Sequence, residues 1–68
     1  MICVMTKYAV FLTYSDDTEV VFNVEVEGTD SEKMGALMMI VRGTLMASCA
    51  CKATAYNEEG FDVVSYVR

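Results

Sequence analysis

The sequence contains no histidine, no tryptophan and no proline. Without histidine it lacks the commonest general base near neutral pH, and the Ser-His and Cys-His nucleophile pairs are excluded. The absence of proline and a hydrophobic fraction of 54% both argue against disorder. We therefore expect a chain that is folded throughout and is not an enzyme.

Positive charge is also scarce: the chain has five Lys and Arg residues and ten Asp and Glu residues, which gives a net charge of -5. Neutralising phosphates requires a basic patch, so direct nucleic-acid binding is not expected. An alternative inverts this reasoning. The acidic surface could imitate nucleic acid and inhibit a host nucleic-acid-handling protein, with Glu25, Glu27, Glu58 and Glu59 as candidate contacts.

The three cysteines, Cys3, Cys49 and Cys51, are an odd number and do not form a disulfide framework. They indicate a reducing cytoplasm, and their simplest interpretation is as small buried core residues. Three thiolates could also bind zinc or copper(I). A closed structural zinc site usually needs four ligands, so a metal site is the weaker alternative and no cofactor is expected.

Neither the start of the chain nor its longest apolar segment indicates a targeting signal or a membrane span. The start, MICVMTKYAV, has no basic region followed by a long apolar core and a cleavage site. Residues 34–51 are apolar over a length that could span a membrane, but Arg42 lies near the middle and would be costly there. No membrane span is expected. The role of residues 1–4, as a mis-assigned start, a strand lead-in or a subunit contact, stays open.

Two strands are predicted in the first half of the chain. Residues 7–14, KYAVFLTY, are rich in aromatic and β-branched side chains, and residues 19–27, EVVFNVEVE, alternate apolar and polar. The intervening Ser-Asp-Asp-Thr at residues 15–18 has short side chains that bond their own backbone and favour a tight turn. These segments predict a β-hairpin.

A helix is predicted to begin close to residue 30 and to continue through residue 47. Thr29 and Glu32 have the spacing of a capping box, in which each residue satisfies a free main-chain N–H of the other. Five apolar side chains recur at the helical period, which predicts a stripe that packs on the sheet. These are Met34, Leu37, Met38, Val41 and Leu45.

The second half of the chain predicts another hairpin. Residues 53–56 are predicted to form a strand with the small residues Ala53 and Ala55 on one side, which permits close packing under a helix, and residues 61–67 form the closing strand. Between them, Gly60 suits the positive-φ position of a bulged loop. The predicted fold is therefore one α+β domain over residues 1–68. It has the order β-β-α-β-β, with a four-stranded, mostly antiparallel sheet and one helix packed on one face.

The predicted helix is apolar on more sides than one sheet can cover. Glycine inside a helix costs about 1 kcal/mol relative to alanine, so its two glycines indicate close approach by another element, and methionine is adaptable at contact surfaces. The candidate interface residues are Met39, Ile40, Arg42, Gly43 and Met46, with Arg42 as a polar orienting contact. The alternative is that the N- and C-terminal strands curl around the helix and bury these faces internally.

The short length, the lack of catalytic groups and the hairpin-helix-hairpin order resemble many small proteins of bacteriophages and prophages. This resemblance rests on no diagnostic motif and assigns no role to any residue. Together with the surplus apolar surface, it makes a non-enzymatic interaction protein the expected function. The expected partner is a second copy of the chain, giving a homodimer in which the helix and an exposed sheet face provide the contact surface, and another protein is the further possibility.

Overall fold

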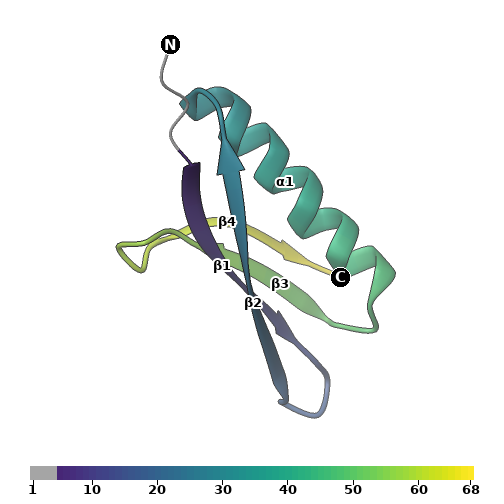
Figure 1. Cartoon of the computed structure of the whole chain (residues 1–68). Helices are drawn as coiled ribbons and strands as arrows, with labels where there is room; N and C mark the ends of the chain where they lie inside the picture. Colours follow the sequence, from purple (N-terminus) through teal and green to yellow (C-terminus); the bar gives the residue numbers. More distant parts are fainter. Residues whose placement is uncertain (1–4) are drawn as a thin grey trace.

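The computed structural model describes residues 5–68, and the question of residues 1–4 lies outside this range. The elements follow the predicted order β-β-α-β-β (Figure 1). Their bounds are β1 (Met5–Thr13), β2 (Glu19–Glu27), α1 (Asp30–Ala47), β3 (Lys52–Tyr56) and β4 (Asp62–Val67).

One four-stranded sheet has the order β2-β1-β3-β4, with every neighbouring pair antiparallel. The helix α1 leads from the edge strand β2 to the inner strand β3 and lies on one face of the sheet (Figure 1). The predicted α+β fold class is thereby confirmed. The opposite face of the sheet and the outer edges of β2 and β4 carry no further helix or strand of residues 5–68.

The turn between β1 and β2 is held by its own polar side chains, as predicted. The Asp16 carboxylate accepts hydrogen bonds from the Thr18 hydroxyl at 2.6 Å and from the Thr18 main-chain N–H at 3.2 Å. These bonds favour the ionised form, the one from the hydroxyl most, and lower the pKa of Asp16. Asp17 adopts a left-handed conformation with φ of 67°, which Asp tolerates better than most residues.

The helix begins at the predicted capping box. The Thr29 hydroxyl accepts from the Glu32 main-chain N–H at 3.3 Å, and the Glu32 carboxylate accepts from the Thr29 main-chain N–H at 3.0 Å. The bond from the Thr29 main chain, with a smaller contribution from its side chain, lowers the pKa of Glu32. Two otherwise unsatisfied donors are therefore bonded at the helix N-terminus.

The core lies between α1 and the sheet. Leu37, Val41 and Leu45 are buried as predicted, whereas Met34 and Met38 lie at the margin of the contact and are 39% and 43% exposed. Ala53 and Ala55 of β3 are fully buried in the same core, as their small size predicted. The helical period therefore identified the centre of the packing stripe correctly, but it predicted burial for Met34 and Met38, which are exposed.

The second hairpin contains the predicted glycine turn and a β-bulge. Gly60 has φ of 88°, and the Asn57 side-chain oxygen accepts from the main-chain N–H groups of Glu59 and Phe61, each at 3.0 Å. The register of β3 and β4 shifts between Ala55 and Tyr56. Phe61 was predicted to start the closing strand, but it lies in the turn and is 65% exposed.

Candidate interaction surface

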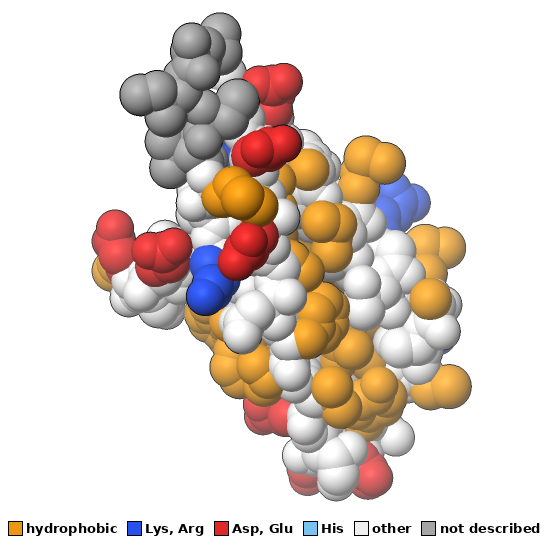
Figure 2. Space-filling view, in the orientation of Figure 1, with side chains coloured by type: hydrophobic (Ala, Val, Ile, Leu, Met, Phe, Trp, Pro, Cys, Tyr) orange, Lys and Arg blue, Asp and Glu red, His pale blue; other side chains and the backbone are white. Residues whose placement is uncertain are grey.

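The outer surface of α1 is exposed. Met39 and Met46 are 77% and 69% exposed, and a Cβ added at Gly35 or Gly43 would meet no atom within 4 Å beyond its chain neighbours and the nearby helix backbone. Figure 2 shows hydrophobic side chains spread over the face of the molecule that carries the helix. The alternative in which the flanking strands curl around α1 and bury these positions is therefore wrong for residues 5–68.

Four of the five candidate interface residues lie on this exposed surface. Met39, Arg42, Gly43 and Met46 are all exposed. Ile40 differs, because its side chain is half-buried and packs against the core. The structure therefore brings four of the five candidates to one side of the molecule, and two of them, Arg42 and Met46, line the same pocket.

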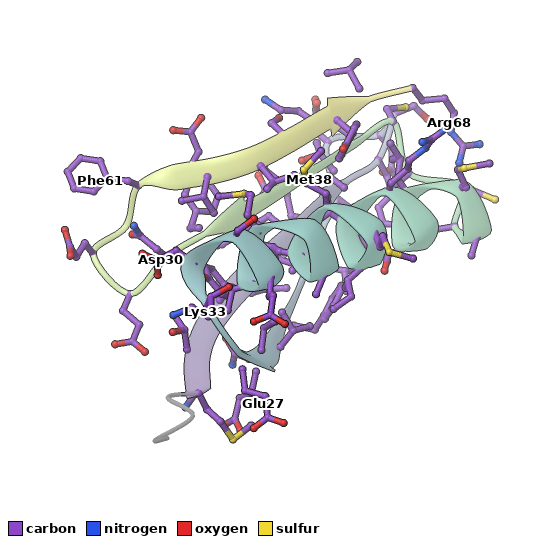
Figure 3. The ribbon with its side chains drawn as sticks, turned by 90° about the horizontal axis from the view of Figure 1, so that it is seen from above. Glu27, Asp30, Lys33, Met38, Phe61 and Arg68 are labelled. Carbon is purple, nitrogen blue, oxygen red and sulfur yellow. The ribbon has the colours of Figure 1, made fainter. Side chains whose placement is uncertain are left out.

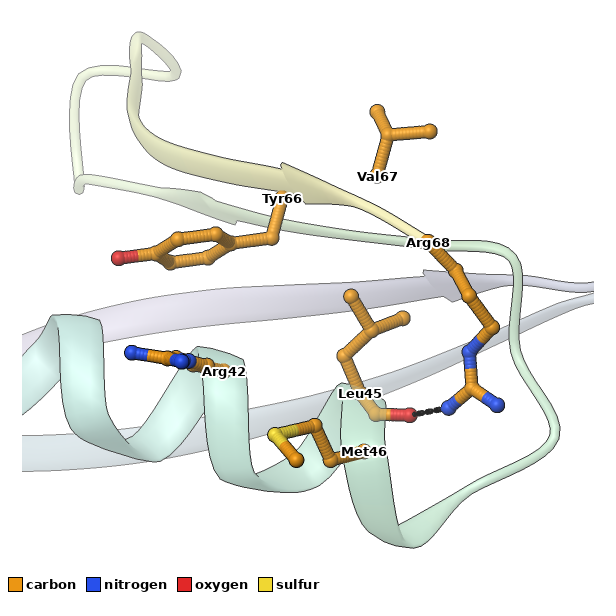
Figure 4. A pocket seen from close by; sticks show the side chains of 6 residues that line it. All are labelled: Arg42, Leu45, Met46, Tyr66, Val67 and Arg68. Atoms are coloured by element: carbon orange, nitrogen blue, oxygen red, sulfur yellow. Dashed lines mark hydrogen bonds between the residues drawn. The ribbon is translucent and has the colours of Figure 1, made fainter.

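A shallow pocket separates the C-terminal half of α1 from the end of β4 (Figure 4). Its lining is apolar apart from two arginines. The lining residues are Arg42, Leu45, Met46, Tyr66, Val67 and Arg68.

Arg68 connects the two walls of this pocket. Its guanidinium donates a hydrogen bond to the main-chain oxygen of Leu45 (Figure 4) and a second one, at 2.8 Å, to the main-chain oxygen of Ser48. The last turn of α1 has no basic residue of its own. Arg68 therefore supplies the positive charge and the donors that the carbonyl groups at a helix C-terminus favour. No pattern in the sequence indicates this role of Arg68, since only folding brings Arg68 to the helix.

The face of the sheet opposite the helix carries an aromatic pair and a hydroxyl pair. The rings of Phe11 and Tyr56 meet edge to face, with centroids 5.2 Å apart and an interplanar angle of 83°. Beside them the hydroxyl groups of Thr54 and Ser65 share a hydrogen bond of 3.1 Å. These side chains contact one another across β1, β3 and β4, whereas Met5, Val21 and Val67 on the same face are exposed.

The acidic residues proposed for nucleic-acid mimicry do not form a uniform negative surface. Lys7 lies opposite Glu25 in the β1–β2 register, and its main-chain N–H donates to the Glu58 carboxylate at 3.3 Å. Glu27 is exposed at the end of β2, and Glu59 is exposed in the turn before β4. The positive charge of Lys7 therefore lies among the four glutamates proposed for mimicry.

Cys49 and Cys51 are both exposed free thiols, so their interpretation as buried core residues is wrong. The connection from α1 to β3 instead buries Ala50, which lies between them. Cys3 lies outside the described residues. Within residues 5–68, no three His, Cys, Asp or Glu side chains come close enough together to hold a metal ion.

No helix in the described part of the chain is long and apolar enough to cross a membrane.

The chain matches no protein-family model, no curated protein and no solved structure. No residue can be assigned a role by similarity to a known protein. Function is therefore inferred from the exposed surface of this chain itself.

Proposed function

We propose that this chain is a non-enzymatic interaction protein that forms a homodimer through the exposed apolar surface of α1. The supporting observation is the exposure of Met39 and Met46 on a helix whose other side is already packed on the sheet. Large apolar side chains that gather on one surface are typical of interaction sites. The absence of histidine from the sequence supports a role that does not involve catalysis.

The size of the chain supports self-association. A domain of about 60 residues buries only about 60% of the surface that its unfolded chain exposes, which leaves its stability marginal. A second copy that covers the apolar side of α1 adds burial without lengthening the chain. A homodimer therefore improves the stability of both subunits.

The charge distribution determines where two copies can approach. The chain carries a net charge of -5, so most pairs of surfaces repel one another. Between Met34 and Ala47, the only charged side chain is that of Arg42. The surface of α1 is therefore the part of the molecule on which two copies can meet with the least repulsion.

The proposal places the protein in the cytoplasm, where reducing conditions keep the exposed thiols of Cys49 and Cys51 reduced. In an oxidising compartment, such thiols would cross-link copies of the chain nonspecifically.

Light scattering tests the proposal, because a homodimer has twice the 7.5 kDa mass of one chain. Met46→Asp places a charge on the contact surface, and we expect it to weaken association at least tenfold, or about 1.4 kcal/mol. Met5→Asp is the matched control, since Met5 is an exposed methionine on β1, away from α1. A wild-type chain that remains a single subunit at all concentrations would contradict the proposal.

A further inference from the structure

The two edges of the sheet differ in charge. The β2 edge carries the exposed glutamates Glu19, Glu25 and Glu27. Antiparallel pairing of two β2 strands about Asn23 would place Glu19 opposite Glu27 of the second copy, and like charges directly opposite one another are destabilising. Charged side chains are a common means by which proteins prevent edge strands from pairing.

The β4 edge has no such protection. No charged side chain lies between Val63 and Val67. The main-chain N–H of Arg68 donates a hydrogen bond of 2.8 Å to the main-chain oxygen of Cys51, the residue just before β3. Because the bonding direction alternates along an antiparallel strand, the N–H groups of Ser65 and Val67 point away from β3. They are directed to the side on which no strand of residues 5–68 lies.

We infer that two copies join through their β4 strands, so that their two sheets become one continuous antiparallel sheet. The inference rests on the proposed homodimer and specifies how the two copies meet. Pairing centred on Ser65 places Ser65 opposite its counterpart and Val64 opposite Tyr66 of the second copy. The outward donors of each copy then meet carbonyl groups of the other, and no like charges lie opposite one another along the paired β4 strands.

The same side of the molecule carries a line of methionines on α1. Met34, Met38, Arg42 and Met46 follow one another at four-residue intervals, so they form one line along the helix, here called the methionine flank. Arg42 and Met46 share a pocket with Tyr66 of β4, and Figure 3 shows Met38 on the side of α1 that faces β4. The methionine flank therefore lies above the β4 edge.

The symmetry of the pairing brings the two flanks together. A two-fold axis perpendicular to the joined sheet keeps both helices on the same face and makes them antiparallel. The methionine flanks then face each other across the axis, above the paired β4 strands. Strand pairing and apolar burial therefore occur in one contact, and each satisfies groups that the single chain leaves exposed.

The area of the contact favours this geometry over pairing of the helices alone. A strip along the 18-residue helix is about 27 Å long and about 10 Å wide, or roughly 270 Å². A standard stable interface buries about 800 Å² on each partner, about one sixth of the 4715 Å² surface of this chain. β4 has six residues and is about 20 Å long, so its layer of the sheet, also about 10 Å thick, adds roughly 200 Å² and brings the footprint to about 470 Å². The helix and the strand edge together come much closer to the required area.

Residue-resolved hydrogen exchange of the wild-type protein, measured by NMR alongside light scattering, tests the inference. We expect the amides of Ser65 and Val67 to exchange at least tenfold more slowly in the dimer than after dilution to single subunits. Tyr66, bonded to β3, should be protected in both states. Asn23, whose amide points away from β1 by the same alternation, should remain unprotected in both.

The outcomes separate the inference from the function on which it depends. A dimer in which Ser65 and Val67 exchange as fast as Asn23 would overturn β4 pairing and leave the homodimer intact. A single subunit at every concentration would overturn both, and it would leave the β4 edge open to a strand of another protein.

Two substitutions on different sides of α1 provide a second measurement. Met38→Asp lies on the methionine flank and should weaken the dimer at least tenfold. Ala47→Asp lies on the outer side, about 140° around the helix from Arg42, at an exposed position, and should leave the dimer unchanged. The reverse pattern would place the contact on the outer side of the helix and overturn β4 pairing.

Discussion

The guanidinium of Arg68 donates a hydrogen bond of 2.8 Å to the main-chain oxygen of Ser48, which joins the end of β4 to the end of α1. This contact places a positive charge at the negative end of the helix dipole. It also fixes the position of the helix C-terminus over β4, beside the methionine flank. The geometry of the proposed contact surface therefore depends on a residue distant from it in the sequence.

Replacing Arg68 by alanine should destabilise the protein by about 1 kcal/mol, because the carbonyl groups at the end of α1 lose a charged donor. Urea unfolding at a fixed protein concentration measures the change. Lys52→Ala is the matched control, since Lys52 is an exposed cation on the neighbouring strand, and it should stay within about 0.5 kcal/mol of wild type. Equal effects of the two substitutions would show that the Arg68 contact contributes little.

The Glu32 capping contact predicts a pH dependence. Folding lowers the pKa of Glu32 below its ordinary value of 4.5, so the ionised carboxylate stabilises the folded state. The contribution is fully present above that ordinary value, and it is lost as pH falls through the lowered folded pKa. Glu32→Gln keeps a hydrogen-bond acceptor but removes the charge. We expect wild type to be more stable than the variant at neutral pH and the difference to shrink below 4.5.

Urea unfolding of both proteins across this pH range measures the effect. The Asp16 carboxylate, whose pKa is also lowered, is present in both proteins and cancels in the difference. A difference that stays constant into acid would show that the charge of Glu32 does not stabilise the helix N-terminus.

The small residues of β3 predict a difference between the two faces of the sheet. Ala55 is fully buried in the core with α1, so Ala55→Leu should overpack the core and cost about 1–3 kcal/mol. Ala9 lies on the opposite face, beside Tyr56 in the register, and is half-buried. Ala9→Leu should therefore cost less than Ala55→Leu in thermal or urea unfolding. The opposite order would place the critical packing on the face without the helix.

The sequence predicted the features that depend on neighbouring residues. The capping box at Thr29 and Glu32 was identified correctly because both partners lie within one helical turn. The same is true of Gly60, whose positive φ belongs to a local turn. The helical period also identified Leu37, Val41 and Leu45 as buried, since their spacing alone places them on one side of the helix.

The tertiary structure decided the features that depend on which segments meet. Strand order made β4 an edge, and the alternation of its residues does not by itself indicate whether the strand has one neighbour or two. The narrow contact of one helix with the sheet left Met34 and Met38 at its margin, and the connection after α1 turned Cys49 and Cys51 outward. Periodicity reports which side chains share a face, whereas exposure depends on how much of that face the rest of the chain can cover.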